Sequence, residues 1–205
     1  MAVKDLLADC RVMDALSDYS IYQTGVVERP VVSADHIQPF LDANVPHLWA
    51  YYCTAQAIHV PNRFIAMPST RNRILGTLLY YYHIEGFLHW GFNFYNSQHS
   101  VRHIDPYLTT DAEEAFPSGD PFLVYPAPDG TAYDSVRGMV LRQALSDLRM
   151  LCYLEEKLGR SAVTELIDSL TPAQLTFSQY PRGKAFFEKL KDAAFEKSDS
   201  ISLCG

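Results

Sequence analysis

HLWAYYC (47–53), PNRFIAMPSTRNRILGTLLYYYHIEGFLHWGFNFYN (61–96), DPY (105–107), GDPFLVYPAPDG (119–130) and SVRGMVLRQALSDLRMLCYLEEKLG (135–159) follow one another along the chain. The nearly continuous apolar run at 47–53 is typical of a parallel strand covered on both faces. A helix is predicted to begin near Pro68, where a missing amide hydrogen does no harm, and a second strand covers 87–94. Strands that alternate with helices indicate a parallel sheet with right-handed crossovers.

Weaker sequence patterns predict further helices and one strand before and after this stretch. Residues 19–23 alternate as a short strand, and Ser33 is a plausible N-cap for a helix that buries Ile37 and Phe40. Asp134 or Ser135 caps the longest predicted helix, which ends near residue 159. The remaining segments of helical character are 1–12, 162–170 and 183–195.

The count of strands decides the architecture. Three strands are predicted, and 122–125 could be a fourth. A closed (β/α) barrel needs eight strands in about 200 residues at the very least. We therefore expect an α/β fold: an incomplete (β/α) barrel made of the last three or four β/α units, followed by C-terminal helices. Residues 1–159 would be the C-terminal portion of the barrel, and 160–205 a helical extension packed on it.

Composition excludes several classes of function. The 205 residues carry 17 scattered basic side chains and a net charge of −7, so nucleic acid is not an expected partner. No apolar run is long enough to span a membrane, and the charged first residues do not fit a signal peptide, which favours a cytoplasmic location. The four cysteines are far apart and form no CxxC pair, so we expect neither a disulfide scaffold nor a zinc site.

The strand over 87–95 carries the best candidates for ligand binding. Alternation places His89, Gly91, Asn93 and Tyr95 on one side and Leu88, Trp90, Phe92 and Phe94 on the other. An amide and a phenol near the end of a barrel strand can bind sugar hydroxyls, and an indole offers a flat apolar face to a pyranose ring. The alternative is that these aromatic side chains only pack against outer helices.

Other polar groups are weaker candidates. Tyr51 or Tyr52 could face a ligand or place a hydroxyl in the core, and Asp105 and Asp120 could contact a polar substrate or simply form turns. His99 and His103 have a metal-ligand spacing only in a helix, and the sequence places no third ligand, so we predict no metal. No Gly-rich phosphate loop, GxSxG motif or obvious pair of catalytic carboxylates is present, so we predict no cofactor and assign no catalytic residue.

Seven short sequence motifs, taken together, resemble those of one protein family. They are WAYYC (49–53), PNRFI (61–65), RILG (73–76), EGFLHWGFNFY (85–95), DPY (105–107), GDPFLVYP (119–126) and DSVRGMVLRQALSDLRML (134–151). In this order they resemble the C-terminal part of glycoside hydrolase family 123 and the related domain of unknown function 4091, which are bacterial proteins with a (β/α)8 catalytic barrel. The resemblance covers about 18–159.

The resemblance implies removal of terminal N-acetylgalactosamine by a mechanism in which the substrate's acetamido group is the nucleophile. The family's adjacent Asp-Glu pair orients that group and supplies the acid, and no Asp-Glu dipeptide occurs in this sequence. We therefore expect a sugar-binding half of a glycosidase-like barrel that is inactive alone. The expected binding residues are Tyr51, Trp90, Asn93, Tyr95 and Asp105.

The chain also departs from the family. Its helix after RILG reads Thr77 and YYYH where the family has Trp and a WKYG-like ending, and Tyr95 stands where Trp is common. Two alternatives are a non-catalytic carbohydrate-binding or scaffold module and a truncated gene product. The expected partners are a glycan containing N-acetylhexosamine and either an N-terminal barrel half or a second copy of the chain. The glycan and its linkage stay open.

Overall fold

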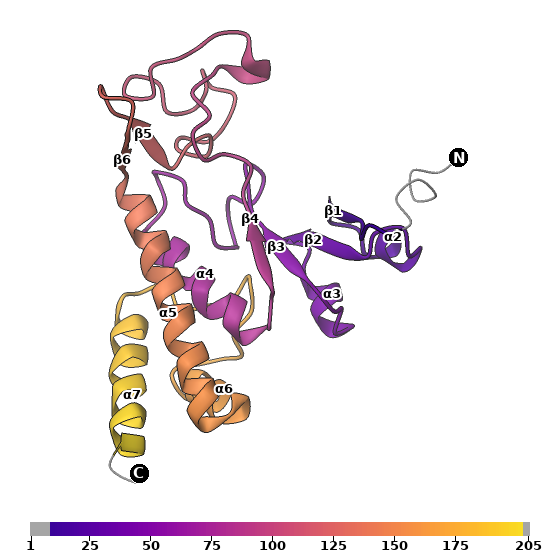
Figure 1. Cartoon of the computed structure of the whole chain (residues 1–205), viewed down its shortest axis with the longest axis vertical. Coiled ribbons are helices and arrows are strands. Elements are labelled where there is room, and N and C mark those ends of the chain that lie inside the picture. The colour runs from indigo at the N-terminus through magenta and orange to yellow at the C-terminus, as the bar shows by residue number, and fades with distance from the viewer. Residues whose placement is uncertain (1–8, 203–205) are drawn as a thin grey trace.

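The computed structural model describes residues 9–202, and the side chains through residue 198. These residues form a mixed α/β fold around a parallel sheet of four strands: β1 (Met13–Leu16), β2 (Arg29–Ser33), β3 (Trp49–Tyr51) and β4 (Gly86–Leu88). The strands lie in the order in which they follow one another along the chain, and each pairs in parallel with the next. Figure 1 shows β1 and β2 on the right side of the molecule, the helices α5, α6 and α7 at the lower left, and the strands β5 and β6 at the upper left.

Two strands of the parallel sheet, β1 and β2, were not predicted, and one predicted strand is a helix. Residues 19–23, predicted as a strand, form the helix α2 (Tyr19–Gln23), which begins where the Asp18 side chain accepts a hydrogen bond from the Ser20 amide. Tyr19 and Tyr22 both contact Phe40, with ring centroids 5.1 and 5.8 Å away, because three residues make about one turn of helix. The strand before α2, β1, was not predicted.

The strand β2 was missed as well. Ser33 belongs to its last position instead of capping a helix, and α3 (Gln38–Asp42) begins after Ile37. Proline is disfavoured within sheets, so Pro30 argues against a strand at this position when only the sequence is considered. The predicted helix at 1–12 lies largely outside the described residues.

The longer helices agree with the prediction. They are α4 (Thr70–Tyr81), α5 (Val136–Leu158), α6 (Arg160–Ser169) and α7 (Ala185–Ser202). Of the two expected caps, Asp134 and Ser135, it is Ser135 that caps α5, since its hydroxyl accepts a hydrogen bond from the Gly138 amide at 3.1 Å. The helices α4 and α5 run side by side in Figure 1 and cross closely at Gly76, where a Cβ atom would lie 2.6 Å from the carbonyl carbon of Ala144. In the described part of the chain, no helix is long and apolar enough to cross a membrane.

The sheet is covered on one face only within the described residues. The strand residues Val32 and Ala50, and Tyr52 directly after β3, are buried in a core shared with α4, α5, α6 and α7. The opposite face carries no helix of the described residues and is called the open face; it is formed by Met13, Ala15, Val31, Trp49 and Leu88. Met13, Ala15 and Leu88 are exposed, whereas Val31 is buried. The Trp49 indole lies across Gly86, where a Cβ atom would be 2.7 Å from a ring carbon. Purely parallel sheets are normally covered on both faces, so this arrangement is incomplete.

The segment between β4 and α5 is long and mostly irregular, as the sequence indicated. It contains a short 3-10 helix, η1 (Gln98–Ser100), and a hairpin of β5 (Val124–Pro126) and β6 (Ala132–Asp134). The predicted fourth strand at 122–125 therefore overlaps an antiparallel hairpin and does not join the parallel sheet. The parallel sheet still has four strands, because β1 and β2 replace the one strand predicted before residue 47. The described residues form no closed barrel.

Candidate functional site

The carboxyl ends of the four parallel strands meet at one edge of the sheet, which is where α/β proteins place their binding groups. Polar side chains follow three of these strand ends. The hydroxyl of Ser17, just after β1, lies 2.7 Å from the hydroxyl of Ser33 in β2 and 3.4 Å from that of Tyr51 in β3. Ser33 also lies 3.2 Å from Nδ1 of His36. These four side chains make a polar row across the edge.

Trp90 lies two residues beyond β4 and combines an exposed ring with a buried hydrogen bond. The residue is 41% exposed. Its indole N–H donates to Oδ2 of Asp120 at 2.9 Å, and the hydroxyl of Thr54 donates to the same oxygen at 2.7 Å. Asp120 has no solvent exposure, so it cannot contact a substrate as its sequence context allowed. Its carboxylate instead fixes the indole through the hydrogen bond from the Trp90 N–H.

His89 lies between this carboxylate and a buried guanidinium. Its Nδ1 accepts hydrogen bonds from Nη2 of Arg63 at 2.8 Å and from the amide of Gly91 at 3.0 Å. Two donors at Nδ1 require an unprotonated nitrogen there, so the ring proton is on Nε2, which lies 3.2 Å from Oδ1 of Asp120. Burial lowers the pKa of His89 below its usual value of 6.5, against the opposing effect of Asp120. The imidazole is neutral at physiological pH.

Backbone pairing brings Asp120 under Trp90. Residues 92–94 run antiparallel to 121–123, with hydrogen bonds from the Leu123 amide to the Phe92 carbonyl at 2.7 Å and from the Phe94 amide to the Pro121 carbonyl at 3.2 Å. Gly91 permits this approach, because a Cβ atom there would lie 2.6 Å from two carbonyl oxygens, those of residues 120 and 121. The segment that carries Asp120 is thereby fixed beside β4.

Two arginines surround this network, Arg63 being buried and Arg137 partly buried. From α5, Arg137 donates to the carbonyl oxygens of Gly119 at 2.5 Å and Phe122 at 2.9 Å, and so clamps both sides of Asp120. Burial lowers the pKa values of Arg137 and Arg63, and each gains a favourable electrostatic contribution from Asp120. Burial also raises the pKa of Tyr52, whose hydroxyl donates to Oδ1 of Asn72 at 3.2 Å. The phenol of Tyr52 is thus a core group, and Tyr51 is the tyrosine at the edge.

The predicted binding residues fall into two groups. Tyr51 and Trp90 follow the carboxyl ends of neighbouring strands, and both are partly accessible. Asn93 is exposed and pairs through its backbone with Phe122, while the hydroxyl of Tyr95 donates to the Val124 carbonyl at 2.8 Å. Asp105 is exposed in the long loop, where its carboxylate accepts a hydrogen bond from the Tyr107 amide at 2.9 Å. Their contact with a ligand stays a prediction.

Trp90 also has two aromatic neighbours: Phe94, which the strand alternation placed on the same side, and Phe116, which the sequence did not indicate. Its ring centroid lies 5.3 Å from that of Phe94 and 5.0 Å from that of Phe116, and both rings are tilted by about 60° instead of stacking in parallel. Phe116 comes from the long loop, which therefore contributes to the surroundings of the indole. Arg63, His89 and Thr54 were not predicted either. The sequence feature that could have indicated Arg63 is a charged residue directly before the apolar residues Phe64 and Ile65.

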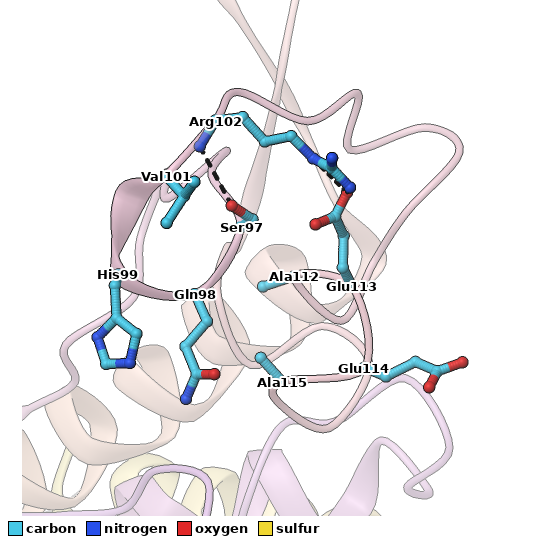
Figure 2. A pocket seen from close by; sticks show the side chains of 9 residues that line it. All are labelled: Ser97, Gln98, His99, Val101, Arg102, Ala112, Glu113, Glu114 and Ala115. Atoms are coloured by element: carbon cyan, nitrogen blue, oxygen red, sulfur yellow. Dashed lines mark hydrogen bonds and ion pairs between the residues drawn. The ribbon is translucent and has the colours of Figure 1, made fainter.

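A separate hollow of about 500 Å³ lies within the long loop. Figure 2 shows that Arg102 reaches over it to pair with Glu113, while His99 and Glu114 point in different directions. The side chains do not converge on a common point, so the hollow has no evident ligand geometry. Across the described residues there is no group of three metal-ligating side chains. His99 lies in η1 at a position with non-helical backbone angles, and His103 pairs through its backbone with Asn96, so the two do not share one face of an α-helix.

Comparison with known proteins agrees with this fold. Residues 1–154 match the model of the glycoside hydrolase 123 catalytic domain. No curated protein matches the chain. A similar solved structure comes from a study of glycolipid glycan hydrolysis by a family 123 glycoside hydrolase from Clostridium perfringens, with 20% sequence identity and a TM-score of 0.54. The match covers 94% of this chain and 35% of that one, so the chain spans about a third of the length of that enzyme. By its match over three quarters of its length, the chain belongs to glycoside hydrolase family 123.

Proposed function

We propose that the chain is the sugar-binding part of a (β/α) barrel of the glycoside hydrolase 123 type, with the carboxyl edge of its parallel sheet as the binding face. The ligand would be a terminal N-acetylhexosamine. One observation carries the proposal: the exposed Trp90 ring is held at this edge by a fully buried carboxylate. Sugar-binding sites use such a rigid aromatic face together with hydroxyl groups, and Tyr51 supplies a hydroxyl nearby.

We propose further that this part does not cleave glycosides alone. Hydrolysis with acetamido assistance needs a carboxylic acid at the scissile bond and a second carboxylate that orients the acetamido group. Of the acidic residues near the carboxyl edge, Asp120 is buried, and Asp35 accepts hydrogen bonds from the Gln56 amide at 3.1 and 3.2 Å. The sequence holds no adjacent Asp-Glu pair. The acid would come from other strands of the barrel.

The open face and the two edge strands support completion of the barrel by further strands. The edges are β1 and β4, and the open face exposes Met13 and Leu88. Unpaired strand edges and uncovered apolar surface favour association. The occupant would be an N-terminal barrel half, with self-association as the substitute when that half is missing. Residues 1–159 would then be the barrel portion and 160–205 its helical extension.

A carbohydrate-binding module without any catalytic role is the second candidate. The same exposed indole favours it, because binding needs only the aromatic face and its hydroxyl neighbours. The two functions differ in one respect. Addition of an N-terminal barrel half should produce hydrolysis only if the chain is part of an enzyme.

Two assays test the proposal. Binding of N-acetylgalactosamine is measured by calorimetry, and hydrolysis is measured with a chromogenic N-acetylgalactosaminide. We expect weak binding, its loss in Trp90→Ala, and no turnover by the chain alone. Tyr153→Ala is the matched control, because this aromatic side chain is also about half exposed but lies on α5, and it should bind as the wild type does. Turnover by the isolated chain, or equal binding by Trp90→Ala, would refute the proposal.

Light scattering tests the association. An open face and two free edges predict dimers or larger species and binding of an apolar dye. A strictly monomeric chain that binds no dye would show that the open face needs no partner.

A further inference from the structure

The indole of Trp90 has an exposed ring face and an N–H group that is hydrogen-bonded to a buried carboxylate. A ring that stacks against a sugar must stay in one orientation, because immobilising a side chain on binding costs about 0.5–1.5 kcal/mol. Phe94 and Phe116 contact the ring without stacking on it in parallel. The His89 ring lies nearly parallel to the indole, with centroids 6.3 Å apart, and the directional contact is the hydrogen bond from the indole N–H to Asp120 at 2.9 Å.

The surroundings of Asp120 favour a carboxylate over an amide. Oδ2 accepts from Thr54 and Trp90, and the protonated Nε2 of His89 lies 3.2 Å from Oδ1, an electrostatic contact without hydrogen-bond geometry. An amide would direct its NH₂ group at one of these donors. His89 cannot change its tautomer to compensate, since its Nδ1 already accepts from Arg63 and from the Gly91 amide.

The buried charge is also balanced at a distance. Arg63 approaches Asp120 through His89, and Arg137 holds the carbonyl oxygens on both sides of it. A buried charge with such partners is stable, whereas one left without them would be costly. The carboxylate of Asp120 thus has cationic residues nearby although it has no contact with solvent.

We infer that Asp120 is a positioning residue for carbohydrate binding, which fixes the Trp90 ring as a preformed sugar platform through a buried network with Thr54, His89 and Arg63. This inference rests on the proposed function, because it names the group that orients the same binding face. Asp120 itself touches no ligand. Its effect on affinity would pass through the orientation of the indole.

The indole N–H proton of Trp90 gives a direct test by NMR of the full chain. The sequence has two tryptophans, so two indole signals are expected, and Trp49→Phe assigns them. In the wild type, the Trp90 signal should be shifted downfield by the carboxylate and should exchange slowly with water. Asp120→Asn should remove that shift and weaken binding of N-acetylgalactosamine by about tenfold, as expected for loss of a hydrogen bond to a charged group.

Asp147→Asn is the matched control. Asp147 is also largely buried, and it accepts from Nε and Nη2 of Arg73 at 2.7 and 3.0 Å, in the contact between α4 and α5. This variant should lower stability but change neither the Trp90 signal nor the affinity. If a general loss of stability explained the Asp120 variant, both variants would weaken sugar binding alike, and the inference would be wrong.

The remaining outcomes are also decisive. An unchanged Trp90 signal in Asp120→Asn, or a changed signal with unchanged affinity, would overturn the inference. If Asp120→Asn does not fold, the exchange rate in the wild type decides, since an N–H that exchanges as fast as that of free tryptophan is not held by a carboxylate. If the wild type binds no sugar, the proposed function fails. The two indole measurements would then still show whether Asp120 orients Trp90.

Discussion

The close crossing of α4 and α5 makes Gly76→Ala an informative substitution. In an isolated helix, alanine is more favourable than glycine by about 1 kcal/mol. At Gly76, however, the new Cβ atom would overlap the backbone carbonyl of Ala144, at 2.6 Å from the carbon and nearer still to the oxygen. A backbone carbonyl cannot rotate away as a side chain can, so the two helices must move apart. Overpacking of this kind costs about 3 kcal/mol.

The expected net effect is a loss of about 2 kcal/mol in the free energy of unfolding, after the gain in helix propensity is subtracted. Urea denaturation followed by circular dichroism measures it. Gly138→Ala in α5 is the matched control, because its Cβ atom would meet only ordinary contacts, the nearest being Leu123 Cγ at 3.6 Å. That variant should gain about 0.5 kcal/mol. If Gly76→Ala were as stable as Gly138→Ala, the packing described for α4 and α5 would be wrong.

Two more predictions concern the site and the long helix. Burial lowers the pKa of His89, so between that lowered value and 6.5 the unfolded chain binds more protons than the folded one, and stability should fall as the pH falls through this window. The wild type should therefore lose more stability than His89→Gln between about pH 7.5 and about pH 5, and equal losses in urea titrations would contradict this. Ser135→Ala should cost about 1–2 kcal/mol, because the hydroxyl caps α5 and donates to the Leu123 carbonyl at 2.5 Å. Ser146→Ala, at an exposed position of the same helix, should change stability by less than about 0.5 kcal/mol, and similar losses in both variants would show that the cap is unimportant.

Local signals in the sequence predicted the long helices well. The N-cap at Ser135 and the proline at residue 68 depend on neighbouring residues only, and the helices α4 and α5 follow them. The resemblance to glycoside hydrolase family 123 is likewise confirmed, since its motifs lie in order along the chain and the family match covers 1–154.

The errors arose where tertiary contacts override local pattern. Residues 19–23 alternate like a strand, yet Tyr19 and Tyr22 pack on Phe40 from one side of a helix. The expected alternation through 87–95 ends at Leu88, because the backbone beyond it pairs with 121–123.

The same cause hid the network under Trp90. Asp120 lies 30 residues from Trp90 and 66 from Thr54 along the chain. No spacing rule connects such positions. The close approach of the two backbone segments requires a glycine at position 91, because a Cβ atom there would overlap the carbonyl groups of residues 120 and 121. From the sequence alone, Asp120 resembled a turn former before proline.

The most direct test of the central claim is a titration of the labelled chain with N-acetylgalactosamine, in which the backbone amide signals show where the sugar binds. We predict that the perturbed amides cluster after the carboxyl ends of β3 and β4, at 52–54 and 89–93, and include Trp90. Perturbed amides confined to α5, α6 and α7, or no change at the carboxyl edge at saturating sugar, would contradict the account.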